Sequence, residues 1–205
     1  SLLLISSLFL MFINNFILGY FLIIFGTFSI LEFLKMNQII NRKNKIREFV
    51  INILFIIYIF LFCSVFLIYS NYLHLKILIF SILLMCAISD IGGYVSGKIF
   101  KGTKLTKISP NKTISGAIGS LVFTCFFALL FFYYLTNNLS LTVLLVGAST
   151  SIGCQIGDLF FSFLKRKSLL DDTGNILPGH GGVLDRVDGI LLGIPVGLIS
   201  LLVIY

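Results

Sequence analysis

Long apolar stretches separated by short polar ones form the main pattern of this chain. A helix that crosses a membrane needs about 20 mainly apolar residues. The pattern predicts such helices over 2–13 with 16–34, 49–69, 73–95, 114–135, 140–163 and 184–205. We therefore predict an all-α, polytopic integral membrane protein, a helical bundle with about six or seven transmembrane helices.

The first apolar stretch is interrupted by Asn14-Asn15. This pair is either the turn of a helical hairpin or part of one long tilted helix, and we favour the hairpin. Residue 1 is Ser, so we expect the natural chain to begin further upstream and the first arm of the hairpin to be truncated.

The composition excludes a water-soluble protein of this size. Hydrophobic residues make up 58% of the 205 positions and charged residues 11%, whereas a soluble domain has about 45–50% and about 25%. A soluble enzyme, a disordered tail and a disulfide scaffold are thereby excluded. The four cysteines lie in apolar runs without CxxC spacing, which indicates buried side chains rather than metal or redox chemistry.

Positive charge is concentrated in alternate loops. The formal net charge is +7, and every Lys and Arg except Lys76 lies in 35–48, 98–112 or 165–186. Because Lys and Arg collect in cytoplasmic loops, we predict that these three loops share the cytoplasmic face. The net charge then reflects membrane topology and not nucleic-acid binding.

Acidic residues are few, so their placement is informative. Six of the eight fall in the two most polar, glycine-rich parts of the chain: Asp90, Asp158, Asp171, Asp172, Asp185 and Asp188. Carboxylates inside a membrane span need a partner and mark candidate functional sites. For Glu32 and Glu48, which lie at span ends beside basic loops, we predict a structural role.

Three spans are predicted to bring acids to a similar depth. At about 1.5 Å of helix rise per residue, Asp90 and Asp158 each lie roughly 10–12 Å along the helix from the basic loop that follows. Asp185 and Asp188 share a helix face because their spacing is i, i+3. Clustered carboxylates suit a hard cation, so we predict Mg²⁺ on Asp158, Asp185 and Asp188, with a second cation plausible in the same cluster. The alternative is Asp–Lys pairing that only holds helices together.

Two polar loops suggest anion binding. Ser109-Pro110 predicts a helix N-terminus, where free N–H groups, Lys112 and Thr113 would attract phosphate; a solvated basic loop is the alternative. Residues 177–188 carry three glycines around His180, which let the backbone approach a ligand, and Arg186, which can fork onto phosphate oxygens.

The segment 162–188, SFLKRKSLLDDTGNILPGHGGVLDRVD, resembles the C-terminal signature of the phosphatidate cytidylyltransferase (CDP-diacylglycerol synthase) family. We call it the signature segment. Gly157-Asp-Leu159, Asp90-Ile-Gly-Gly-Tyr94 and Ser109-Pro-Asn-Lys-Thr113 fit the same family pattern, in order along the chain. The resemblance covers residues 85–205, which would form the catalytic region of a single membrane domain, with helices before them at 1–84.

The resemblance implies that CTP and phosphatidate react to form CDP-diacylglycerol and pyrophosphate, and that they do so at the cytoplasmic side of a bacterial inner membrane. The small-xxx-small spacing of Gly189, Gly193 and Gly197 predicts close helix packing. The resemblance also implies a homodimer, in which this series could serve an interface. The implied catalytic residues are Asp158, Asp185, Asp188, Lys165, Arg166 and His180, the last as a hydrogen-bond partner of phosphate and not a base. The implied binding residues are Ser109, Lys112, Thr113, Ser162, Asp172, Gly181, Gly182, Arg186 and Asp90.

Three positions depart from the family pattern. Asp171 stands where a Lys is usual, Phe161 where many members have Glu, and Ser115 where Glu or Gln is common. The first change removes a phosphate-binding cation, for which 165–167 could compensate. Alternative functions are a CTP-dependent polyprenol or lipid kinase and a membrane cation transporter, but the acids gather at one face and no inverted repeat is visible.

Overall fold

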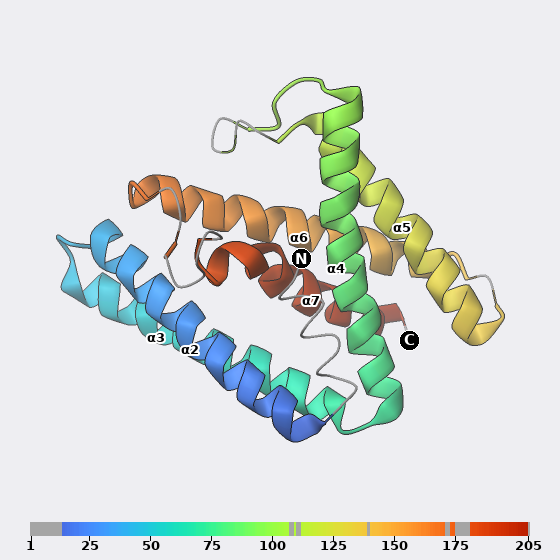
Figure 1. The fold of residues 1–205 in the computed structure, drawn as a ribbon, viewed down its shortest axis with the longest axis horizontal. Coiled ribbons are helices and arrows are strands. Elements are labelled where there is room, and N and C mark those ends of the chain that lie inside the picture. The colour runs from blue at the N-terminus through green and yellow to red at the C-terminus, as the bar shows by residue number, and fades with distance from the viewer. Residues whose placement is uncertain are drawn as a thin grey trace. The chain divides into compact units, whose positions relative to one another are not determined.

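The computed structural model describes residues 14–106, 109, 112–138, 140–170, 173–174 and 181–204. Its helices, labelled as in Figure 1, are α2 (Asn15–Ile40), α3 (Lys45–Ser70), α4 (Leu73–Phe100), α5 (Ile114–Thr136), α6 (Thr142–Lys167) and α7 (Leu184–Ile204). Between described residues, the chain forms an isolated β-bridge that joins Lys104 and Thr113. The predicted all-α class is confirmed.

Each of the six helices is long and apolar enough to cross a membrane. Large apolar side chains are exposed along them, for example Phe60 at 70% and Phe126 at 63%. Such exposure is expected where the surrounding solvent is lipid, since a soluble monomer rarely shows large apolar patches. The prediction of a multi-pass membrane protein is confirmed, and its cytoplasmic orientation stays a prediction.

Polar side chains at the first positions set where helices begin. Asn14 is extended and its side chain accepts a hydrogen bond from the Phe16 amide, so α2 starts at Asn15 and one helix running through this pair is excluded. The first arm of the predicted hairpin, 2–13, lies outside the described residues. Asn44 caps α3 in the same way, accepting from the Arg47 amide.

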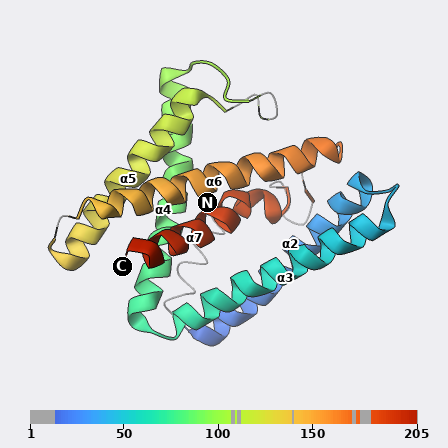
Figure 2. The same ribbon diagram turned by 180° about the vertical axis from the view of Figure 1, so that it is seen from behind.

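Two compact units make up the chain. The first contains the described parts of Ser1–Lys76 and Phe161–Val187, and the second those of Ile77–Phe160 and Asp188–Tyr205. In the first unit α2 and α3 lie side by side, as both ribbon views show (Figures 1 and 2). The division of the sequence at 84/85 stays a prediction.

Small residues let the helices of the second unit approach closely. A Cβ on Gly157 of α6 would lie 2.5 Å from the Asp188 carbonyl oxygen of α7. The series suggested as a dimer interface is used inside this unit: Gly193 faces Cys154, and Gly197 faces Thr150 and Ile82. Within this unit the series therefore has a packing role, and the homodimer stays a prediction.

Hydroxyl groups join three helices of the second unit. Ser89 of α4, Ser120 of α5 and Ser151 of α6 form a triangle with Oγ–Oγ distances of 2.7, 3.1 and 2.9 Å. All three are buried, and the Gln155 side-chain amide lies 3.2 Å from the Ser120 Oγ. Because Ser89 directly precedes Asp90, this triangle fixes the register of the helices beside the candidate acids.

Candidate functional site

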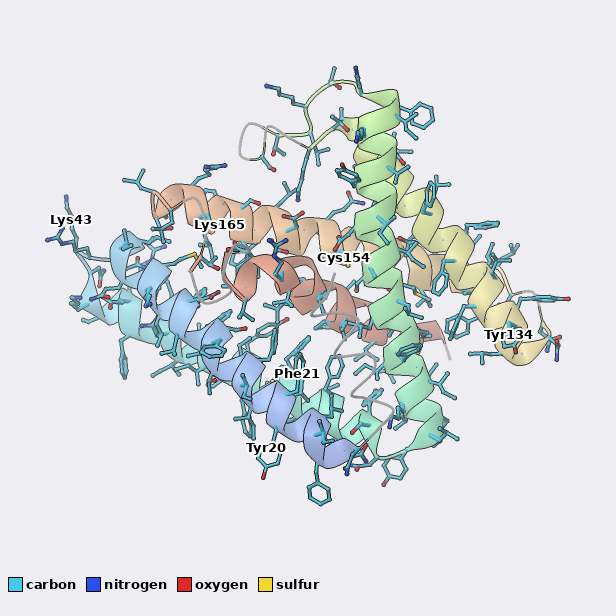
Figure 3. The ribbon with its side chains drawn as sticks, in the orientation of Figure 1. Tyr20, Phe21, Lys43, Tyr134, Cys154 and Lys165 are labelled. Atoms are coloured by element: carbon cyan, nitrogen blue, oxygen red, sulfur yellow. The ribbon has the colours of Figure 1, made fainter. Side chains whose placement is uncertain are left out.

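The signature segment forms a polar cluster in the first unit. Lys165, near the end of α6, donates to Asp185 in the first turn of α7, with 2.8 Å between Nζ and Oδ1. Their side chains are 17% and 9% exposed. Figure 3 shows Lys165 on the final part of α6. Two members of the predicted catalytic set are therefore in direct contact.

The second oxygen of Asp185 is held by the loop between α6 and α7. Oδ2 accepts from the Thr173 amide at 2.8 Å and from the Gly182 amide at 3.1 Å. The Thr173 hydroxyl lies 3.0 Å from the same oxygen. With both oxygens engaged, the orientation of the Asp185 carboxylate is fixed.

Glu32 is an unexpected member of this cluster. It lies on α2, is 1% exposed, and its Oε1 accepts from the Val183 amide at 2.9 Å. Its Oε2 accepts from the Leu184 amide and the Thr173 hydroxyl, each at 2.8 Å. The predicted structural role did not anticipate these contacts, although an acid inside an apolar stretch, which must find a partner, was the signal for them.

Glycines surround the Glu32 carboxylate. A Cβ on Gly174 would lie 2.7 Å from Oε1, and one on Gly182 would lie 2.6 Å from Oε2. Gly181 has a φ of +79°, which favours glycine. Gly181 and Gly182 are predicted to let the backbone approach a bound ligand. Here Gly182 approaches Glu32 and donates to Asp185, and its contact with phosphate stays a prediction.

A second group of charges lies in the second unit. Lys112, from the loop between α4 and α5, forms an ion pair with Asp158 of α6. Asp90 of α4 interacts electrostatically with both. The loop is folded back on itself by a hydrogen bond from the Leu105 amide to the Lys112 carbonyl, which presents Lys112 to the helices.

The predicted helix start at Ser109 is corrected by the structure. α5 begins at Ile114, and Thr113 is its cap, accepting from the Gly116 amide. Ser109 instead stays in the preceding loop, where its carbonyl accepts from the Lys112 amide. The reason is that Thr113 can satisfy a first-turn amide with its own side chain, whereas Ser109 is four residues too early.

Asp188 belongs to the second unit, with Asp158. Its carbonyl oxygen lies against Gly157, the residue before Asp158. Asp185 belongs to the first unit. Within the described ranges no group of three or more His, Cys, Asp or Glu side chains forms a metal-binding arrangement. The oxygen-rich donors match the ligand preference of Mg²⁺, and the three-aspartate site stays a prediction.

The other predicted residues lie either in the first unit or outside the described residues. Arg166 and Arg186 are exposed in the first unit, where Ser162 lies on α6. His180 and Asp172 lie outside the described residues.

At two of the three positions that depart from the family pattern, the side chain makes contacts with neighbouring residues that suit it. Phe161 is 3% exposed and meets the Phe55 ring edge-on, with centroids 6.5 Å apart. Ser115 donates to the Lys101 carbonyl and lies 3.0 Å from the Thr113 hydroxyl. Asp171 lies outside the described residues.

Comparison with known proteins supports the family resemblance of the signature segment. A sequence model of the cytidylyltransferase family matches residues 1–204. The chain is similar to phosphatidate cytidylyltransferases of Rickettsia bellii (41% identity over 117 residues, 52% of this chain and 50% of the relative) and Staphylococcus haemolyticus (40% over 119 residues, 57% and 45%). That of Helicobacter pylori is 40% identical over 115 residues, 55% of this chain and 42% of the relative. In these alignments the chain spans about half the length of the curated relatives it matches.

Proposed function

The chain belongs to the cytidylyltransferase family, and on this premise we propose that it transfers the cytidylyl group of CTP to phosphatidate. The products are CDP-diacylglycerol and pyrophosphate. The observation that carries the proposal is the contact between Lys165 and Asp185 within the signature segment. The names of the curated relatives support the choice of substrates.

The reaction brings two anions together. A phosphate oxygen of the lipid attacks the α-phosphorus of CTP. The bond from that phosphorus to the oxygen that bridges the α- and β-phosphorus atoms breaks, and pyrophosphate leaves with that oxygen. Since the lipid phosphate is already ionised at neutral pH, the protein must mainly position the reactants and neutralise charge. We assign this task to the cations of the two clusters, Lys112, Lys165, Arg166 and Arg186.

Two of these cations are paired with carboxylates in the structure. Lys165 contacts Asp185 and Lys112 contacts Asp158, so each charge is balanced before substrate arrives. We propose that each lysine changes its partner from aspartate to a substrate phosphate. Lys112 and Asp158 keep 25% and 35% of their side chains exposed, which leaves this pair accessible for the exchange.

Mg²⁺ is the cofactor that the donor chemistry favours. Asp158, Asp185 and Asp188 are the residues we propose to hold it, with Asp90 near Asp158 for a second cation. Once bound, the ion would supply positive charge to the phosphates. The carboxylates themselves are oriented by backbone amides, as the Thr173 and Gly182 contacts of Asp185 illustrate.

The location that fits the proposal is a bacterial inner membrane. CTP comes from the cytosol and phosphatidate lies in the leaflet, so a site beside the basic loops can reach both substrates. A homodimer remains part of the proposal by analogy with the family.

Purified protein in detergent, given phosphatidate and CTP labelled at the α-phosphorus, tests the proposal. Labelled CDP-diacylglycerol should form with Mg²⁺ and should not form with EDTA. Asp188→Asn should abolish product while the protein remains inserted in membranes. Wild-type turnover in this variant would refute the metal assignment.

The same assay separates the alternatives. With CTP labelled at the γ-phosphorus, a lipid kinase would place the label on lipid, whereas the proposed reaction places it in pyrophosphate. Cation flux in proteoliposomes without any lipid product would favour a transporter and overturn the proposal.

A further inference from the structure

Glu32 is a buried acid on α2. Its carboxylate is 1% exposed, and within the described residues no Lys or Arg forms an ion pair with it. Burying an ionised carboxylate is costly unless hydrogen bonds replace its water. Here two backbone amides and one hydroxyl do so, and the positive end of the α7 dipole adds to the compensation.

The donors come from both sides of the loop between α6 and α7. Thr173 comes before residues 175–180, which lie outside the described ranges, and Val183 and Leu184 come after them. One carboxylate on α2 therefore ties together two stretches that the loop separates. Gly174 and Gly182 lie so close to Glu32 that neither has room for a side chain.

Thr173 links Glu32 to the proposed chemistry. Its hydroxyl is 2.8 Å from Glu32 Oε2 and 3.0 Å from Asp185 Oδ2, while its amide donates to Asp185. The hydroxyl has a single proton and can serve one carboxylate at a time. When it serves Glu32, the Thr173 amide remains directed at Asp185.

We infer that Glu32 is a positioning residue: it fixes both stretches of the loop and thereby sets where Asp185 and Lys165 lie. The inference rests on the proposed function, because Asp185 and Lys165 belong to that site. Glu32 acts through Thr173 and the Val183 and Leu184 amides and does not touch substrate.

Glu32→Gln is the direct test because it keeps the shape and removes the charge. The new NH₂ group would face a donor, either the Leu184 amide or the Val183 amide. We expect hydrogen–deuterium exchange of these two amides to accelerate about tenfold. Exchange in α3 should remain at the wild-type rate, and CDP-diacylglycerol formation should fall about tenfold or more.

Glu48→Gln is the matched control, since it makes the same change in the same unit. Glu48 pairs with Lys45 at the start of α3, and within the described residues it forms no hydrogen bond or ion pair with the loop between α6 and α7. It should leave both exchange at 183–184 and turnover unchanged. Thr173→Val, which keeps the amide but removes the hydroxyl, should shift exchange and turnover in the same direction as Glu32→Gln, by a smaller factor.

The exchange measurement is independent of activity. If the wild-type protein makes no CDP-diacylglycerol, the proposed function is refuted. Faster exchange at 183–184 in Glu32→Gln would still establish that Glu32 holds the two stretches of the loop. Unchanged exchange in an active protein would overturn the inference alone. So would wild-type turnover in Glu32→Gln, or an increase in exchange that extends equally through α3, which would indicate a general structural role.

Discussion

Gly182 is the position where the packing around Glu32 can be tested most quantitatively. Its φ is not in the left-handed region, so an alanine there meets only a steric obstacle. The added Cβ would lie 2.6 Å from Glu32 Oε2, about 0.8 Å short of the 3.4 Å at which contact becomes ordinary. It would also collide with the Thr173 hydroxyl.

The loss of stability in Gly182→Ala follows from the hydrogen bonds of Glu32 that the added methyl group would stretch. A displacement of about 0.8 Å along the bond would stretch the 2.8 Å contact between the Leu184 amide and Glu32 to about 3.6 Å, which is no longer a hydrogen bond. Each bond to a charged acceptor is worth about 1.5–3 kcal/mol. We therefore expect Gly182→Ala to lower the free energy of unfolding by about 2–4 kcal/mol.

Reversible unfolding in mixed detergent micelles, followed by circular dichroism, would measure this change. Gly19→Ala is the control: its Cβ would meet only Leu67 at 3.7 Å, and alanine is the better helix former. Combining Gly182→Ala with Thr173→Ala removes one of the two obstacles, so the double variant should be more stable than the sum of the single effects by about 1 kcal/mol. Strict additivity, or a neutral Gly182→Ala, would refute the steric reasoning.

Three further outcomes are expected. Phe161→Glu, which restores the residue common in the family, should destabilise the protein by about 2 kcal/mol or more in the same unfolding assay, since the side chain is 3% exposed and faces the Phe55 ring; equal stability would mean that a polar partner is within reach. Ser151→Ala should cost about 1 kcal/mol, because Ser89 and Ser120 each lose a partner, and an unchanged free energy of unfolding would show that the remaining two hydroxyls suffice. Asp171→Lys should lower the KM for CTP if that position faces phosphate, and an unchanged KM in steady-state kinetics would mean that it points away.

The helices could be predicted from the sequence because membrane spans are set by a length of apolar chain. The predicted spans 49–69 and 114–135 correspond to α3 and α5 within a few residues. Their starts are also local, since Asn44 and Thr113 cap them with contacts three residues away. The error at Ser109 arose where two hydroxyl residues competed for one helix start.

The pairing of charges could not be predicted in the same way. Lys112 and Asp158 are far apart in the chain, and the pattern of residues assigned one to phosphate and the other to metal. Glu32 and Leu184 are 152 positions apart. No periodicity connects such positions, so only the folded backbone reveals that one acid serves both the loop and the next helix.

The capping of α7 by Glu32 limits how this protein can be rearranged by recombination. A chimaera that joined residues 85–205 to foreign leading helices would inherit Thr173 and the Val183 and Leu184 amides without an acceptor for them. Swapping the leading helices between relatives should succeed only where the incoming segment carries an acid at the matching turn. The signature segment and α2, which carries Glu32, must therefore be inherited together.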